Sequence, residues 1–285
     1  MRNSRLDVRP LSGAGGAEIF GVDVAQDLDD DTVRDIRDAL NEHCVVFFRD
    51  QELDVARHKA FARRFGPIFI HPNYGTGADP EVVMVRREPG DTSYVGEDWH
   101  TDTTMVAEPP MAAILYGIDV PPYGGDTLFA NQYLAYDALS PTMKKMLKDL
   151  RGVHSDITEA GPLSGKNNGR STRHRDDAAW QETRNTHPIV RTNRETGRRS
   201  LFVNAANTIA IDGMTDAESK ALLASCSSTA TAPSSPSASA GRRARSPSGT
   251  TAVPGTLRWA IRDRSAGSCA ASRSVAIYRY DRQDA

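Results

Sequence analysis

The sequence predicts a mainly β protein with flanking helices. Short stretches of alternating or continuous apolar residues recur up to about Leu223, separated by turn-forming residues such as glycine, proline and asparagine. Apolar alternation over roughly four to eight residues is typical of strands, and only a few stretches repeat at helical spacing. With 285 residues, of which 39% are hydrophobic, the chain can bury the core of one large domain or of two small ones.

The clearest predicted strand is a continuous apolar run, Cys44–Phe48. Such a run is typical of a strand that is buried on both faces. Alternating residues predict further strands, which end at glycine, proline, asparagine or aspartate. Their ranges are 6–11, 17–23, 82–85, 111–120, 153–156, 187–192 and 200–204.

The first predicted helix begins at residues 29–32, where the text Asp-Asp-Asp-Thr supplies an N-cap and first-turn acids. Val33, Ile36 and Leu40 follow at helical spacing, and His43 ends the helix. Start and stop residues predict more helices over 55–65, 131–139, 142–150 and 216–223.

Composition excludes several classes of protein. The net charge of -2 gives no basic field for nucleic acid, and no run of 18 apolar residues predicts a membrane span. The first residues have no apolar core like that of a signal peptide. Cys44, Cys226 and Cys269 form no metal or disulfide pattern, so we expect a reduced, cytoplasmic setting. A homo-oligomer is compatible with this composition.

The most informative stretch is residues 98–104, Asp-Trp-His-Thr-Asp-Thr-Thr. If it is extended, His100 and Asp102 point to the same face, because side chains two apart do so in a strand. One imidazole and one carboxylate are two members of the 2-His-1-carboxylate set that holds non-haem Fe(II). The pair alone also fits an ordinary His–Asp hydrogen bond at the mouth of a strand.

A second motif is the text GGDT, residues 124–127. The glycines permit a tight turn, and Thr127 opens the next strand, where its hydroxyl can donate to a carboxylate. An ordinary hairpin turn is the alternative interpretation. Two polar stretches, 88–96 and 158–186, are predicted to be a loop over the site and a mobile lid.

The strings WHTDTTM, EPPMAAILYGIDVPPYGGDTLFAN, IHPNY and HPIVRT…TGRRSLFVN resemble the taurine dioxygenase (TauD/TfdA) family of Fe(II)/2-oxoglutarate-dependent dioxygenases. The resemblance runs from about Leu6 to about Leu223. It implies a double-stranded β-helix, or jelly roll, as the fold of a domain over residues 1–224. It also implies Fe(2+) as the metal, with 2-oxoglutarate and O2 as co-substrates.

The resemblance assigns roles to individual residues. His100 and Asp102 would be the metal ligands and the catalytic residues. Thr127 would hold 2-oxoglutarate, with Arg273 as the candidate for the arginine that assists it.

In the family, residues matching His71 and Tyr74 contact the anionic substrate. The expected substrate is therefore a small organic anion: a taurine-like sulfonate, a sulfate ester or an aryloxyacetate.

The chain departs from its family after Ala224. From Ser225 to Ala252 it has no Leu, Ile, Val, Phe, Tyr, Trp, Asp, Glu or Lys, and this composition predicts disorder. The family places core strands here, with the distal histidine ligand, whereas the last histidine of this chain is His187. We interpret residues 225–272 as low-complexity, out-of-frame text and residues 273–285 as a remnant of the closing strand.

We interpret this composition as the product of a slip of the reading frame. Codons that permit ASCSSTATAPSSPSASAGRRARSPSGTTAVPGT also permit, two bases on, the family pattern PEF…RFRW…AIWDNR…H, which includes the lost histidine. The expected outcome is a dioxygenase impaired in this chain. An inactive pseudo-enzyme or a binding protein on the same fold is the alternative. A zinc site of His100, Asp102 and His187 is a third interpretation, less favoured because nothing in the sequence brings His187 to that pair. His187 is not taken as the missing iron ligand, because in the family this histidine belongs to a structural strand.

Overall fold

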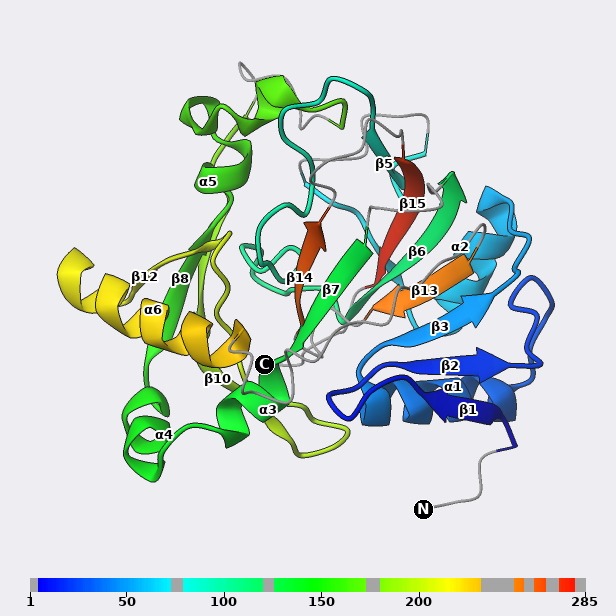
Figure 1. Ribbon diagram of the computed structural model, residues 1–285, viewed down its shortest axis with the longest axis horizontal. Coiled ribbons are helices and arrows are strands. Elements are labelled where there is room, and N and C mark those ends of the chain that lie inside the picture. Colours follow the sequence, from blue (N-terminus) through cyan, green and yellow to red (C-terminus); the bar gives the residue numbers. More distant parts are fainter. Residues whose placement is uncertain are drawn as a thin grey trace.

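The computed structural model describes residues 5–72, 79–119, 126–172, 180–231, 249–253, 259–264 and 272–279. One large sheet forms half of the molecule, in the order β1-β2-β3-β13-β6-β15-β4, with β5 also paired to β15 (Figure 1). Its strands are β1 (Asp7–Pro10), β2 (Ala17–Phe20), β3 (Val46–Arg49), β4 (Ile68–Phe69), β5 (Val83–Arg87), β6 (Ala112–Asp119), β13 (Gly249–Val253) and β15 (Ser272–Arg279).

Smaller sheets form the other half of the molecule. Three strands pair in the order β12-β8-β9, and two further pairs are β10-β11 and β14-β7. The sheet-rich architecture confirms the mainly β prediction, and most expected strands are present within a few residues. The strands are β7 (Asp126–Asn131), β8 (Arg151–Ser155), β9 (Arg184–Pro188), β10 (Val190–Thr192), β11 (Arg199–Leu201), β12 (Thr208–Ile211) and β14 (Trp259–Arg264).

The helices cover the sheets and close two hydrophobic cores. In the first core, α1 (Asp30–His43) and α2 (Val55–Arg63) pack on β2 and β3, where Phe48 and Phe61 meet edge to face at 5.9 Å. The second core lies under α3 (Gln132–Asp137), α4 (Pro141–Leu147) and α6 (Asp216–Thr231). The one further α-helix described is α5 (Ile157–Ala160), followed by the short 3-10 turns η1 (Pro162–Ser164) and η2 (Lys166–Gly169). Within the described residues, no helix is both long and apolar enough to cross a bilayer.

Helix α1 begins and ends where the sequence indicates. The Asp29 side chain accepts a hydrogen bond from the backbone N–H of Thr32 at 2.6 Å, which satisfies a donor that the helix itself leaves open. At the other end Cys44 adopts a left-handed φ of 68° and its N–H bonds to the carbonyl of Leu40. Helix α6, by contrast, runs to Thr231 and not to Leu223, because alanine, serine and a buried Cys226 continue it past the change in composition.

The last three strands of the chain pair with strands from its first half. β13 lies between β3 and β6, β14 pairs with β7, and β15 pairs with β6, β5 and β4. The predicted division into residues 1–224, 225–272 and 273–285 stays a prediction. Its first boundary falls inside α6, and β13 and β14 lie in the second range.

Candidate functional site

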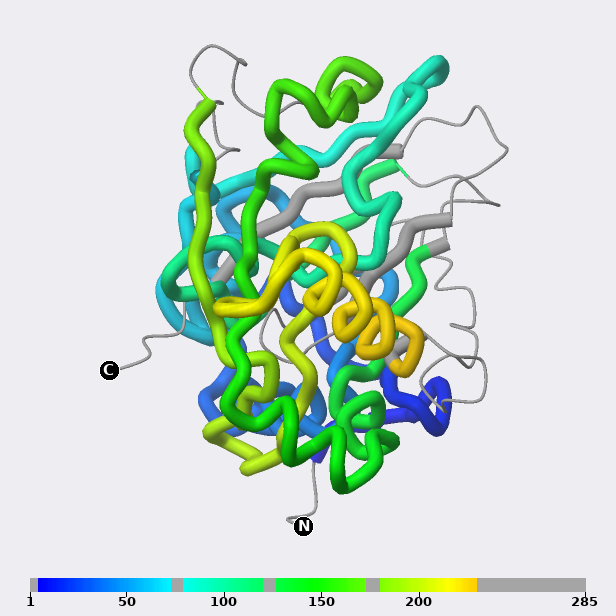
Figure 2. The backbone as a smooth tube through the Cα atoms, turned by 90° about the vertical axis from the view of Figure 1, so that its left-hand side faces the viewer, coloured from blue at the N-terminus to red at the C-terminus, as the bar shows by residue number. Residues whose placement is uncertain are grey.

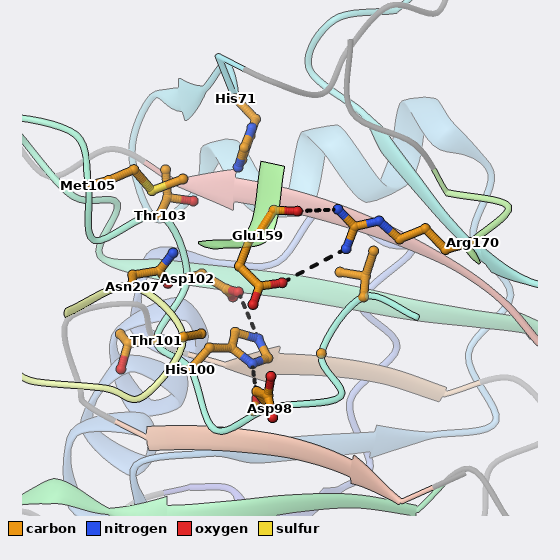
Figure 3. A pocket seen from close by; sticks show the side chains of 13 residues that line it. His71, Asp98, His100, Thr101, Asp102, Thr103, Met105, Glu159, Arg170 and Asn207 are labelled. Carbon is orange, nitrogen blue, oxygen red and sulfur yellow. Dashed lines mark hydrogen bonds and ion pairs between the residues drawn. The ribbon is translucent and has the colours of Figure 1, made fainter. Parts of the chain in front are cut away.

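One pocket brings together residues from four parts of the chain (Figure 3). Its walls are the loop before and after His100, the end of β4, the segment of α5 and η2, and the loop that leads into β12. The described lining residues are His71, Val95, Gly96, Asp98, His100, Thr101, Asp102, Thr103, Met105, Glu159, Arg170, Ala206 and Asn207.

His100 and Asp102 converge in this pocket. His100 Nε2 lies 3.3 Å from Asp102 Oδ1, and Figure 3 shows the ring and the carboxylate facing each other. The expected extended segment is wrong, however. His100 forms a single bridge, turns follow it, and Thr103 has a left-handed φ of 52°. The turn therefore brings the two side chains together, where we had expected strand alternation to do so.

The second ring nitrogen of His100 is also held. His100 Nδ1 donates to the backbone carbonyl of Asp98 at 2.8 Å, since a carbonyl oxygen can only accept. Burial by itself would lower the pKa of His100, but the hydrogen bond to Asp102, the charge of Asp102 and the Asp98 carbonyl outweigh it, so the pKa lies above its ordinary value. With Nδ1 fixed in this way, Nε2 is the nitrogen that is aimed at the carboxylate and is available to a metal.

The loop that carries the pair is anchored to the three-stranded sheet and the segment after β11. Side chains from β8 and β9, together with residues of the segment 204–206, bond to four residues of this loop. Three of these bonds satisfy backbone carbonyl oxygens of the loop, and two hold the Thr104 hydroxyl. The bonds are Ala206 N to Trp99 O (3.3 Å), Asn204 Nδ2 to Thr104 Oγ1 (3.3 Å), His154 Nδ1 with Thr104 Oγ1 (3.0 Å), Asn185 Nδ2 to Met105 O (2.6 Å) and His187 Nε2 to Val106 O (2.9 Å).

His187 is one of these anchors. Its Nε2 bonds to the Val106 carbonyl, and its ring packs against His154 and Phe202 with centroids 5.4 Å away in both cases. It is not among the described residues that line the pocket. This placement gives no support to a zinc site that would join it to His100 and Asp102.

Among the described residues of the pocket, His100 and Asp102 form one close pair of metal-type ligands. Within the described ranges, no group of three or more His, Cys, Asp or Glu side chains could hold a metal ion. His100 and Asp102 have the chemistry and the separation of a ligand pair, but the described residues do not complete a 2-His-1-carboxylate set.

The predicted substrate residues are placed only in part. His71 lines the pocket and is 5% exposed. Burial lowers its pKa to about 4, against the opposing charge of Asp102, so the ring is neutral at pH 7 and can donate a hydrogen bond but no positive charge. Tyr74 lies outside the described residues.

The two residues predicted to bind 2-oxoglutarate, Thr127 and Arg273, are not among the described residues that line the pocket. Thr127 lies in β7, is exposed, and is absent from the described pocket lining. Arg273 lies in β15, where its backbone is opposite Arg86 and Asp119, but its side chain is outside the described part of the chain.

Six polar lining residues had no predicted role: Asp98, Thr101 and Thr103 beside the pair, and Glu159, Arg170 and Asn207 from distant segments. The Arg170 side chain is 1% exposed and its Nη2 donates to the Glu159 carbonyl at 2.8 Å, while its Nε has no hydrogen-bond partner within the described structure. Both residues come from the segment that we predicted to be a lid. Nothing in its polar text distinguishes these two residues from their neighbours, so no sequence signal could have found them.

Comparisons with known proteins show which family the chain resembles over most of its length. The model of the taurine catabolism dioxygenase TauD, TfdA family matches residues 7–235. An alkylsulfatase from Acinetobacter baylyi is 34% identical over 202 residues, which is 70% of this chain and 63% of that protein. An alpha-ketoglutarate-dependent sulfate ester dioxygenase from Pseudomonas putida is 35% identical over 198 residues, 69% of this chain and 65% of that protein.

Each of these two matches therefore spans less than two thirds of the relative's own length. A solved structure, a taurine dioxygenase from Burkholderia xenovorans, superposes with a TM-score of 0.78 at 31% identity, covering 97% of this chain and 90% of that one. The matched range holds His71, His100, Asp102 and Thr127 and ends near the change in composition. The chain belongs to the taurine catabolism dioxygenase TauD, TfdA family.

Proposed function

We propose that this chain has the site of an Fe(II)- and 2-oxoglutarate-dependent dioxygenase on a jelly-roll fold, with His100 and Asp102 as metal ligands and catalytic residues. The observation that carries the proposal is the convergence of His100 Nε2 and Asp102 Oδ1, 3.3 Å apart, in a pocket of a chain that belongs to this family. When bound, iron together with 2-oxoglutarate and O2 would supply the oxidising chemistry, while the protein orients the substrate and excludes water.

The proposed substrate is a small organic anion: a taurine-like sulfonate, a sulfate ester or an aryloxyacetate. Two relatives are named for sulfate esters or alkyl sulfates, and a structural neighbour is named for taurine. Buried His71 would give a neutral hydrogen bond to the anionic group, and Tyr74 would be its partner. Thr127 and Arg273 are the proposed contacts for 2-oxoglutarate.

We propose further that this activity is impaired. The described residues provide two donors, and no histidine follows His187. Loss of supporting contacts around a metal typically costs about 10 to 100-fold in affinity, so the loss of a direct ligand should cost at least that much. The reading-frame slip after Ala224 is the proposed cause. DNA sequencing across codons 220–275 tests it, because an intact frame that lacks the permitted codons would rule it out.

An inactive relative that keeps the pocket for binding is the alternative function. The missing third donor favours it, since a pocket of His71, Arg170 and Asn207 can persist without iron.

Metal analysis and a succinate-release assay separate the two proposals. Purified full-length chain is loaded with Fe(II) without oxygen, and then assayed with a sulfonate, an alkyl sulfate and an aryloxyacetate. The impaired enzyme should bind iron weakly and release a small amount of succinate that disappears in His100→Gln and Asp102→Asn. Full activity with stoichiometric iron would refute the impairment. Succinate release that both variants retain would refute the assignment of the pair.

A further inference from the structure

We propose that Lys166 is a positioning residue for the metal pair, His100 and Asp102. It ties the loop that holds His100 to the segment from α5 to η2, called here the cover of the pocket. This inference deepens the proposed function and rests on it, because it takes His100 to be a metal ligand. Lys166 lies in η2, between two acidic side chains that line the pocket, and it is not itself a lining residue.

The first contact of Lys166 reaches the metal-pair loop. Its Nζ donates to Asp98 Oδ2 at 2.7 Å, and Glu97 Oε1 lies 3.7 Å away. Asp98 is the residue whose backbone carbonyl accepts the proton of His100 Nδ1 at 2.8 Å. A restraint on the Asp98 side chain is therefore also a restraint on the group that sets the direction of the His100 ring.

The second contact reaches the cover. Lys166 Nζ donates to Glu159 Oε1 at 2.6 Å, and Figure 3 shows the Glu159 carboxylate directed toward Asp102 and His100. Arg170 holds the backbone of the same glutamate through its carbonyl, at 2.8 Å. The ammonium group of Lys166 thus lies between the carboxylates of Asp98 and Glu159 and holds both in place.

The backbone around Lys166 is fastened to the loop that precedes His100. Ser93 Oγ donates to the Lys166 carbonyl at 2.7 Å, and the N–H groups of Thr92 and Ser93 donate to the Gly169 carbonyl at 2.8 and 3.0 Å. Figure 2 shows the two segments at the same end of the molecule. The segment from α5 to η2 therefore forms one unit with this loop, and Lys166 connects that unit to Asp98.

The charge balance favours the same role. Burial would lower the pKa of Lys166, but hydrogen bonds and charges of Asp98 and Glu159 outweigh it, so its pKa lies above the ordinary value and the ammonium persists at pH 7. Removing the amine would leave Asp98, Glu159 and Glu97 close together without their shared cation. Their repulsion would shift the Asp98 backbone and release the His100 ring.

The test reads the His100 ring directly, without metal. Full-length protein with isotope-labelled histidine rings is studied by long-range proton–nitrogen NMR at a fixed alkaline pH, and the His100 signals are identified by their loss in His100→Gln. Lys166→Met is compared with the wild type and with Lys166→Arg, which keeps the cation. Lys59→Met is the matched control, because Lys59 is paired equally well, with Asp79 at 2.8 Å and Glu81 at 2.5 Å, outside the pocket.

We expect a single neutral ring form in the wild type and a mixture of both neutral forms in Lys166→Met. Lys166→Arg should restore the single form, and Lys59→Met should leave it unchanged. Identical spectra for Lys166→Met and wild type would overturn the proposal, as would the same change in Lys59→Met.

A second readout is Mn(II) affinity by equilibrium dialysis, which should fall by about 10-fold in Lys166→Met. If even the wild type binds no Mn(II), the proposed metal function fails while the ring spectra still decide the role of Lys166.

Discussion

The two sides of the candidate metal site come from different parts of the sequence. The side that carries His100 and Asp102 is held by hydrogen bonds from β8, β9 and the segment that leads into β12, all of which precede the change in composition at Ser225. The side that should bring a third ligand belongs to the tail, where Ser225–Ala252 offers no aliphatic residue larger than alanine. A ligand pair can thus be fully supported while the set to which it belongs stays incomplete.

The hydrogen bonds that anchor the loop of His100 and Asp102 are therefore independent of whether the proposed set of metal ligands is complete. Asn185 and His187 bond to the carbonyls of Met105 and Val106, and neither contact needs the tail. The experiments below change one side of the site at a time.

The largest effect should come from repairing the tail. A gene with the frame corrected between codons 224 and 273 would encode the family's closing strands and the distal histidine. Because a third protein ligand is then present, we expect Fe(II) affinity to rise by at least about 10 to 100-fold and succinate release to rise with it. Iron content and succinate release of the repaired and original chains are the measurements. A repaired chain that stays as inactive as the original would show that the tail is not what limits the site.

The next effect concerns the first hydrophobic core, around β3 and the helices α1 and α2. Phe48 is 1% exposed and packs against Phe61, so Phe48→Ala should lower the free energy of unfolding by about 3 to 5 kcal/mol. Denaturant unfolding of the original chain measures it. Phe20→Ala is the control, since Phe20 is 36% exposed and should cost much less. Equal losses in the two variants would mean that the core around β3 is not well formed in this chain.

A pH dependence should come from the same side of the molecule. Burial lowers the pKa of His58 to about 4, whereas an unfolded histidine titrates near 6.5. The unfolded chain therefore binds more protons, so the contribution of neutral His58 is complete above about pH 6.5 and is lost as the pH falls toward 4. Between pH 7 and pH 5 the loss is about 2 kcal/mol.

His58→Leu should reduce the difference between unfolding free energies at pH 7 and pH 5 by that amount. His43→Leu is the control, because His43 lies at the end of α1 and is not buried. An unchanged pH dependence in His58→Leu would show that another group carries it.

The smallest effect tests the anchoring of the metal-pair loop. Asn185→Ala removes the 2.6 Å bond to the Met105 carbonyl and should cost about 1 kcal/mol of stability. It should also weaken Mn(II) binding, because the turn that joins His100 to Asp102 loses a support. Asn193→Ala removes comparable bonds in the β10-β11 turn and should leave Mn(II) binding unaltered. Equal binding in both variants would argue that the turn holds itself.

Local signals in the sequence predicted local structure well. The Asp29 cap, the apolar run at residues 44–48 and the glycine–proline stop after α2 depend on neighbouring residues, and the corresponding α1, β3 and α2 lie within a few residues of their predicted positions. The meeting of His100 and Asp102 was also predicted, although for the wrong local reason, since a left-handed Thr103 could not be foreseen.

What could not be predicted depends on contacts between distant segments. Glu159, Arg170 and Asn207 reach the pocket only because α5 and the loop before β12 fold over residues 98–106, and no spacing records that. Strand β12 was missed because its text, Thr-Ile-Ala-Ile, is short and lies beside a turn-forming asparagine. The continuation of α6 to Thr231 was missed because a change in composition was taken for the end of a helix.

The position of Asn207 would suit an additional metal ligand. It lines the pocket on the face where Figure 3 places Asp102, and its own backbone is fixed by Asn204 Oδ1 at 2.8 Å. Asn207→His would add an imidazole to the pocket, beside those of His71 and His100, from a segment that precedes the change in composition. A three-donor centre could then be built entirely from residues that precede Ser225.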